Sequence, residues 1–121
     1  MYRATTPTHT FIFDVDPEET FKKILITYAQ KGEVVVEKGK EDLTVERKQE
    51  ADGSFVWEAS LQLTQEETNL FDASQLYCTG QMPTPKVVEI QIRALTYENE
   101  AVAFDKMTVL LQDVLNDEVL T

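Results

Sequence analysis

The sequence has little of several residue types on which common protein functions depend. It contains one cysteine, Cys78, and one histidine, His9, among 121 residues. A single cysteine cannot form an intrachain disulfide, and it favours a reducing compartment. No stretch comes near the ~20 consecutive apolar residues of a membrane-spanning helix, and residues 1–10 lack the basic start and apolar run of a signal peptide. These absences predict a soluble intracellular protein.

Basic residues are also scarce. The chain has 11 Lys and Arg against 22 Asp and Glu, which gives a formal charge of −11 at neutral pH. Affinity for duplex DNA comes from counterions displaced by a dense basic face, and the basic residues here are scattered along the chain. We therefore expect neither nucleic acid nor membrane as a partner. The charge would also suit an inhibitor that occupies the nucleic-acid groove of a host nuclease or defence complex, which stays open as an alternative.

Glycine and proline are few, with four residues of each. The glycines are isolated from one another, so neither a phosphate-binding loop nor a dinucleotide fingerprint can be assembled from them. The 42% of hydrophobic residues is nevertheless enough to fill one core, and the length fits a single domain spanning residues 1–121.

Alternation of apolar and polar residues with a period of two is the dominant pattern, and it predicts strands. In residues 9–15 the same side of the strand carries His9, Phe11, Phe13 and Val15. The clearest strand covers residues 55–63 and should be central, with inward side chains at Phe55, Trp57, Ala59, Leu61 and Leu63. Further strands are expected at 23–30, 34–37, 43–47, 88–94 and 101–111, the last one bulged near residues 105–106 or lying at a sheet edge.

Turn and helix signals separate these strands. Gly32 allows a tight hairpin turn, and further turns are expected at residues 38–40 and 51–53. Asp16 and Pro17 are typical of a helix start, and Thr64 with Glu67 has the spacing of a capping box. About seven strands with one or two short helical turns predict an all-β, immunoglobulin-like antiparallel β-sandwich, with a small open barrel as the alternative.

Two segments do not fit this periodic pattern. Residues 72–85 contain one glycine and two prolines without sustained alternation, which predicts a long surface loop. Residues 114–121 are expected to form a flexible tail.

The residue pattern predicts no catalytic, cofactor or metal site. Carboxylates cluster between Asp14 and Glu19, but an EF-hand loop counted from Asp14 would need glycine where Glu19 stands and an acid where Leu25 stands. Asp16 is better explained as a helix cap. His9 and Cys78 could in principle form a nucleophilic pair, but Cys78 has no basic neighbour in sequence to lower its pKa. We therefore expect a non-enzymatic protein.

Aromatic side chains raise two further possibilities. Trp57 and Phe55 could form a stacking platform in a carbohydrate-binding module, although their place in the regular alternation assigns them to the core. The predicted loop carries residues of the kind enriched at interface centres. These candidate interaction residues are Leu76, Tyr77, Met82 and Pro83. The alternative is that they fold back over one open end of the sandwich.

Three segments together carry a resemblance to known proteins: RATTPTHTF at residues 3–11, LQLTQEET at 61–68 and VEIQIRA at 88–94. The chain resembles a group of small phage- and prophage-encoded proteins with an N-terminal Thr-Thr-Pro-Thr-His segment and a Leu-Thr-Gln-Glu-(Glu/Asp)-Thr block. Those relatives pass almost directly from the capping-box helix to the next strand, so residues 72–85 are an insertion here.

The resemblance implies a β-sandwich component of the virion, associated with its tail, neck or capsid, with no catalytic residues to carry over. Such a protein would be present in the cytoplasm of the bacterial host during assembly and then in the particle. Its partners would be other virion subunits or copies of itself.

The N-terminal segment has a physical role that fits this implication. Pro7 disfavours helix at Thr6 and lacks a backbone N–H, so Thr6, Pro7 and Thr8 are predicted to enter the sheet extended along an edge. An exposed edge can accept a strand from another chain. These three residues are therefore candidate interaction residues.

Overall fold

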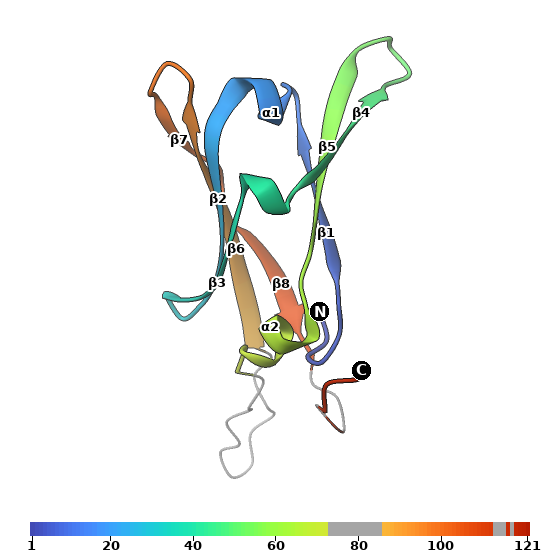
Figure 1. Ribbon diagram of the computed structural model, residues 1–121, viewed down its shortest axis with the longest axis vertical. Coiled ribbons are helices and arrows are strands. Elements are labelled where there is room, and N and C mark those ends of the chain that lie inside the picture. The colour runs from blue at the N-terminus through green and yellow to red at the C-terminus, as the bar shows by residue number, and fades with distance from the viewer. Residues whose placement is uncertain (73–85, 113–115, 117) are drawn as a thin grey trace, which may run out of the picture.

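The computed structural model describes residues 1–72, 86–112, 116 and 118–121 (Figure 1). Within these residues the chain forms two antiparallel sheets, two short α-helices and one 3-10 helix. In chain order the elements are β1 (Thr8–Phe13), α1 (Pro17–Thr20), β2 (Phe21–Gln30), β3 (Glu33–Gly39), η1 (Lys40–Asp42), β4 (Thr44–Gln49), β5 (Phe55–Gln62), α2 (Gln65–Asn69), β6 (Lys86–Thr96), β7 (Ala101–Ala103) and β8 (Met107–Leu111).

The two sheets face each other as the layers of a sandwich (Figure 1). One sheet has the order β1-β5-β4, and the other has the order β3-β2-β6-β7 with β8 also paired to β6. In an immunoglobulin-type sandwich, strands B, E and D form part of one sheet while C, F and G form the other. The order β1-β5-β4 matches B-E-D, and β2-β6-β8 matches C-F-G with β3 beside C. The predicted all-β sandwich is confirmed, and β5 is central in its sheet as expected.

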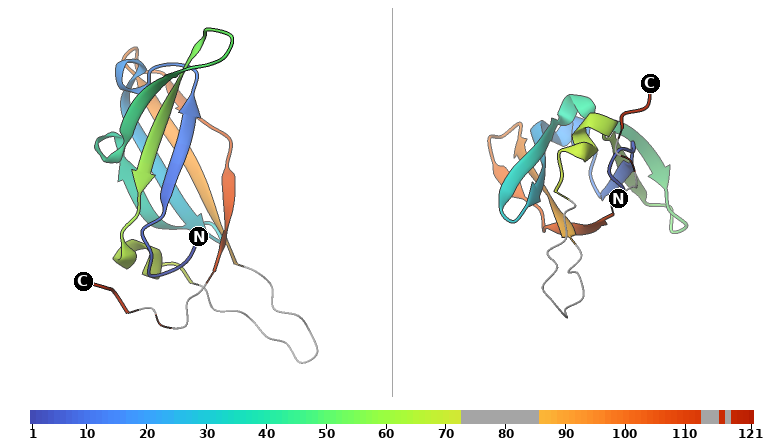
Figure 2. Two further views of the ribbon diagram at one scale, coloured as in Figure 1. Left: turned by 90° about the vertical axis from the view of Figure 1, so that its right-hand side faces the viewer. Right: turned by 90° about the horizontal axis from the view of Figure 1, so that it is seen from below.

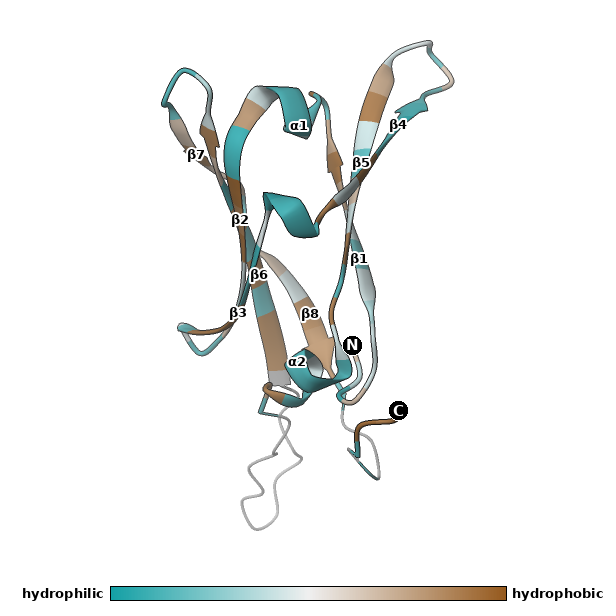
Figure 3. Ribbon diagram, in the orientation of Figure 1, coloured by the Kyte–Doolittle hydropathy of each residue, from teal (hydrophilic) through white to brown (hydrophobic). Residues whose placement is uncertain are grey.

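The core lies between the sheets and is built from the inward side chains of the alternating strands. Hydrophobic and hydrophilic bands alternate along β5 and β6, as this arrangement requires (Figure 3). Its largest fully buried hydrophobic side chains include Tyr28, Phe71, Ile26, Leu61 and Leu63. Burying these side chains supplies most of the stabilisation of a fold that has few helical contacts.

The local turn and cap signals are confirmed. Asp16 caps α1 by accepting a hydrogen bond from the Glu18 N–H over 3.0 Å. Thr64 accepts from the Glu67 N–H over 3.1 Å, and the Glu67 carboxylate accepts from the Thr64 N–H over 2.9 Å. Gly32, at the turn between β2 and β3, has a φ of 78°, which glycine adopts without steric cost. These contacts form the caps and the turn at the positions that the sequence predicted.

Three expectations need correction. Val15 was expected on the inner side with Phe11, but it lies beyond the end of β1 and is exposed. The predicted strand 101–111 is two strands, β7 and β8, which both pair with β6, and residues 104–106 separate them at the place where a bulge was expected. Phe55 was assigned to the core, but 41% of its surface is exposed.

The position of Phe55 explains its exposure. It lies in the β4–β5 hairpin, which extends past the last residue paired with β1 and projects away from the opposite sheet (Figure 1). No facing layer covers the ring there, and instead the Arg47 guanidinium lies 4.4 Å from the ring centroid. Trp57, two residues further along β5, packs against the core as predicted.

Candidate functional site

Strand β1 forms one edge of the three-stranded sheet. It pairs with β5 on one side, from Thr8 opposite Gln62 to Phe13 opposite Trp57. Among the described residues no strand pairs with its other side. Figure 2 shows β1, in blue, as the outermost strand of this sheet.

The backbone groups of β1 alternate in direction. The Leu63 N–H donates to the Pro7 carbonyl over 3.0 Å, so these two residues form a hydrogen-bonded pair. Hydrogen-bonded pairs recur at every second residue of an antiparallel ladder, which places the N–H and C=O groups of His9, Phe11 and Phe13 toward β5. The same groups of Thr8, Thr10 and Ile12 therefore point away from the sheet and remain open to another strand.

The edge is open because the segment before β1 joins the other sheet. In an immunoglobulin-type sheet, strand A covers the outer side of strand B, the position that β1 holds here. Residues 1–3 instead run beside β8: Tyr2 bridges Gln112 in parallel, and the Gln112 N–H donates to the Met1 carbonyl over 2.7 Å. No described residue therefore fills the place beside β1 that strand A would occupy.

The structure revises where the predicted edge begins. Thr6 and Pro7 do not extend the open edge, because their carbonyls accept hydrogen bonds from the Gln62 side chain and the Leu63 N–H. Thr5 is held by the buried Thr68, whose hydroxyl oxygen lies 3.3 Å from the Thr5 N and 3.0 Å from the Thr5 carbonyl oxygen. Of the three predicted interaction residues in this segment, only Thr8 lies on the open edge.

Strand β1 lacks the features that usually protect an edge. Its sequence THTFIF has no residue that is charged at neutral pH and no bulge, and Ile12 is 69% exposed. Strand β4 is the other edge of the three-stranded sheet, and β3 is an edge of the second sheet. Each of these two strands carries three charged residues. Charges, bulges and short strands discourage edge pairing in natural sheets. Only β1 combines length, neutrality and an uncovered side among the described edge strands.

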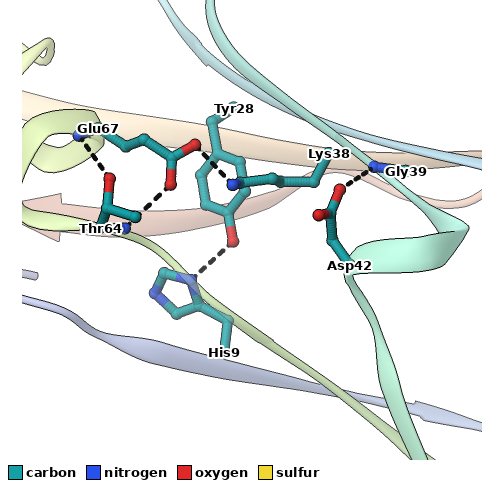
Figure 4. A network of polar contacts seen from close by, with 7 residues as sticks. All are labelled: His9, Tyr28, Lys38, Gly39, Asp42, Thr64 and Glu67. Carbon is teal, nitrogen blue, oxygen red and sulfur yellow. Dashed lines mark hydrogen bonds and ion pairs between the residues drawn. The ribbon is translucent and has the colours of Figure 1, made fainter.

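A polar network behind β1 fixes the strand to the opposite sheet (Figure 4). His9 Nδ1 lies 2.7 Å from the Tyr28 hydroxyl, and Tyr28 belongs to β2 in the other layer. Near this pair, Lys38 Nζ lies 2.7 Å from the Glu67 carboxylate, joining β3 to α2. Because Glu67 also completes the capping box with Thr64, the network ties the start of β1, both sheets and α2 into one unit.

Burial changes the acid–base properties of this network. Burial lowers the pKa of His9 below its ordinary value, and the positive charge of the Met1 amino group lowers it further. Burial raises the pKa of Tyr28, and the negative charge of Glu67 adds to this effect. Burial also disfavours ionised Glu67, but its bonds to Lys38 and the Thr64 N–H outweigh that cost and hold its pKa low. At neutral pH the network thus combines neutral His9 and Tyr28 with an ionised Lys38–Glu67 pair.

The lowered pKa of His9 predicts a pH dependence of stability. Unfolded chains bind a proton at His9 below about pH 6.5, whereas the folded protein takes it up only at lower pH. The unfolded state then binds more protons, so we expect the free energy of unfolding to fall as the pH drops below about 6.5. Urea unfolding between pH 7.5 and 5.0 measures this loss, and His9→Gln should flatten it. An unchanged slope in that variant would contradict the role of His9.

The other predicted site residues divide into two groups. Leu76, Tyr77, Met82, Pro83 and Cys78 lie outside the described residues. Of the acidic residues between 14 and 19, Asp16 caps α1 and Glu18 and Glu19 lie in its first turn, while Asp14 lies before the helix. No group of three or more His, Cys, Asp or Glu side chains within the described ranges is placed to hold a metal ion.

A groove on the other sheet gathers basic residues but is not a clear anion site. Its lining includes Lys22, Lys23, Lys38, Lys40 and Arg93. Lys38 is paired with Glu67, and Lys40 donates to the carbonyls of Glu18 and Phe21. Three glutamates also line the groove, so the cations left over are balanced by carboxylates. Its mixed charge favours no particular ligand.

Comparison with protein-family models, curated proteins and solved structures finds no match to this chain. None of the helices among the described residues is long and apolar enough to cross a membrane.

Sequence reasoning missed several residues that shape this surface. Tyr28 was predicted in a strand and Lys38 in a turn, neither with a polar role, and Thr68 was predicted only as part of the short helix after the capping box. Nothing in the local pattern distinguishes them, because their partners are 19 or more residues away in the chain. For Thr10 and Ile12, one available signal was that β1 is free of charge over its whole length.

Proposed function

We propose that this protein is a non-enzymatic structural or accessory component of a phage particle, and that it acts by accepting a β-strand at the open edge of β1. The observation that carries the proposal is the uncovered, uncharged edge of Thr8, Thr10 and Ile12. Strand addition gains affinity from backbone hydrogen bonds and specificity from the side chains that alternate along the edge.

The surroundings of the edge support this use. The Thr5–Thr68 contact holds the chain at one end of β1, and the bond from His9 to Tyr28 holds the strand itself against the opposite sheet. A strand fixed in this way loses little conformational entropy when a partner binds, which favours affinity. The resemblance of the sequence to phage-encoded proteins supplies the setting in which the partner would be another particle subunit.

Incorporation into particles tests the proposal. Particles purified from an induced lysogen that encodes this chain are analysed by mass spectrometry, with the wild-type gene and with Thr10→Pro. Proline removes the outward N–H of Thr10 and leaves the backbone bonds between β1 and β5 in place. It also removes the Thr10 hydroxyl, whose oxygen lies 3.1 Å from the Ser60 hydroxyl oxygen on β5. We expect wild-type protein in particles and a strong loss of the variant.

The matched control is Arg47→Pro on β4. The Glu50 N–H donates to the Ser54 carbonyl, and the alternation from that pair places the N–H of Arg47 outward on the opposite edge of the same sheet. This variant should be incorporated like wild type. Absence of the wild-type protein from particles, or equal incorporation of Thr10→Pro, would overturn the proposal.

A further inference from the structure

We infer that the strand accepted by β1 is the β1 strand of a second copy, paired antiparallel about a two-fold axis at Thr10. This inference rests on the proposed function, since it names the partner of the same edge. The place beside β1, which none of the described residues fills, is that of strand A, which runs antiparallel to strand B in an immunoglobulin-type sheet. A second β1 running antiparallel satisfies that direction.

The register follows from the backbone directions. Only Thr8, Thr10 and Ile12 offer outward N–H and C=O groups within β1. Pairing Thr10 with Thr10 of the second copy places Thr8 opposite Ile12 on both sides of the axis, so every outward group of both strands is used. Shifting the register by two residues leaves some of these groups unpaired or brings Asp14 into the ladder. The two-fold register is thus the one that satisfies the most backbone groups.

The side chains permit this pairing. Thr8, Thr10 and Ile12 are all exposed on the outer face of the sheet, and none is charged. Threonine pairs and contacts between threonine and β-branched residues stabilise directly opposed positions of antiparallel strands. Neither β3 nor β4 could pair with its own copy as readily, because each would bring several charged side chains together.

The net charge of the chain predicts how this dimer should respond to salt. Two copies of charge −11 repel each other at long range, while the contact itself is neutral. Salt screens repulsion between exposed charges over a distance of about 10 Å at 0.1 M. We therefore expect the dimer to strengthen as ionic strength rises, the opposite of a contact held by ion pairs.

Light scattering coupled to size-exclusion chromatography tests the inference with the full chain. A single strand pair is smaller than the ~1200 Å² of stable complexes, so measurements should extend to about 1 mM protein. We expect the mass to rise from 13.8 kDa to twice that value with concentration and with salt. Thr10→Lys and Thr10→Glu should each stay monomeric, because like charges would meet at the axis.

Mixing these two variants is the decisive step. Lysine opposite glutamate is favourable only when Thr10 faces Thr10, so the mixture should form a heterodimer although neither variant dimerises alone. The matched controls are Thr44→Lys and Thr44→Glu, because Thr44 flanks Ser60 on β4 as Thr10 does on β1, and both threonines are exposed. These variants should dimerise like wild type.

The outcomes separate the inference from the proposed function. A wild-type chain that stays monomeric at high concentration and salt, or a mixture that fails to associate, would overturn the two-fold pairing. If Thr10→Pro were nevertheless lost from particles, the edge would bind a different subunit and the proposed function would stand. If the two charged variants dimerise only when mixed, but the wild-type protein is absent from particles, the two-fold pairing would be supported and the role in the particle contradicted.

Discussion

Tyr28→Ala is expected to lower the free energy of unfolding by about 3–5 kcal/mol, the cost of removing a large aromatic ring from a packed core. The Tyr28 side chain is fully buried and packs edge to face against Phe71, with the ring centroids 6.3 Å apart. Tyr28→Phe keeps the ring and removes only the hydroxyl bonded to His9. We expect that variant to lose about 1–2 kcal/mol, because the partner nitrogen is left without its bond. Urea unfolding at pH 7.5 measures both losses.

The phenylalanine variant has a second readout. Without the Tyr28 hydroxyl, His9 loses the hydrogen bond at Nδ1, so the pKa of His9 in the folded protein should change. Titration of His9 by NMR in wild type and Tyr28→Phe would show this as a shift of the His9 pKa. Equal pKa values and equal stabilities would contradict the bond between the two sheets.

Phe13→Ala is expected to cost about 3–5 kcal/mol, whereas Phe55→Ala should cost about 1 kcal/mol or less. Phe13 is buried at the end of β1, and its ring lies 6.2 Å from that of Phe21 and 5.6 Å from that of Phe104. Phe55 lies on the projecting hairpin and loses mainly its contact with Arg47. Thermal and urea unfolding of the two variants measure the difference.

This pair is internally controlled because both changes remove the same side chain from neighbouring strands. Arg47→Ala should destabilise the protein about as little as Phe55→Ala, since each removes one partner of the same exposed contact. Similar large losses for Phe13→Ala and Phe55→Ala would show that the hairpin is packed more tightly than the structure indicates.

Predictions that rest on short-range signals are correct. The capping box of Thr64 and Glu67, the cap at Asp16 and the turn at Gly32 each depend on residues within a few positions of one another, so they can be recognised without the fold. The alternation in residues 55–63 likewise determined the inward side chains of β5 wherever a second layer faces them.

The wrong predictions concern residues at which the alternation continues although the strand or the opposite sheet has already ended. Phe55 continues the alternation of β5, but the opposite sheet ends before it. Val15 continues the alternation of β1, but the chain has already turned toward α1. Periodicity shows which side of a strand a residue occupies, and it cannot show whether another layer covers that side.

The charged residues of the chain are distributed unequally among the edge strands of the two sheets. Charged side chains interrupt β3 and β4, where they discourage pairing with other chains. Strand β1 is without such charges, and the network of His9 and Tyr28 fixes it from behind. Among the described edge strands, β1 is also longer than the uncharged, three-residue β7, and its edge is the surface that the proposed function uses.

The sequence by itself determined where most strands, turns and caps lie and the all-β class, because the alternation, turn and capping preferences that predict them involve residues close in the chain. Only the tertiary structure decided that residues 1–3 run beside β8 rather than β1, that Thr68 holds Thr5, and that Tyr28 reaches His9. These are contacts between distant segments, and they depend on how two sheets pack rather than on any local preference. The open edge of β1 is a consequence of that packing.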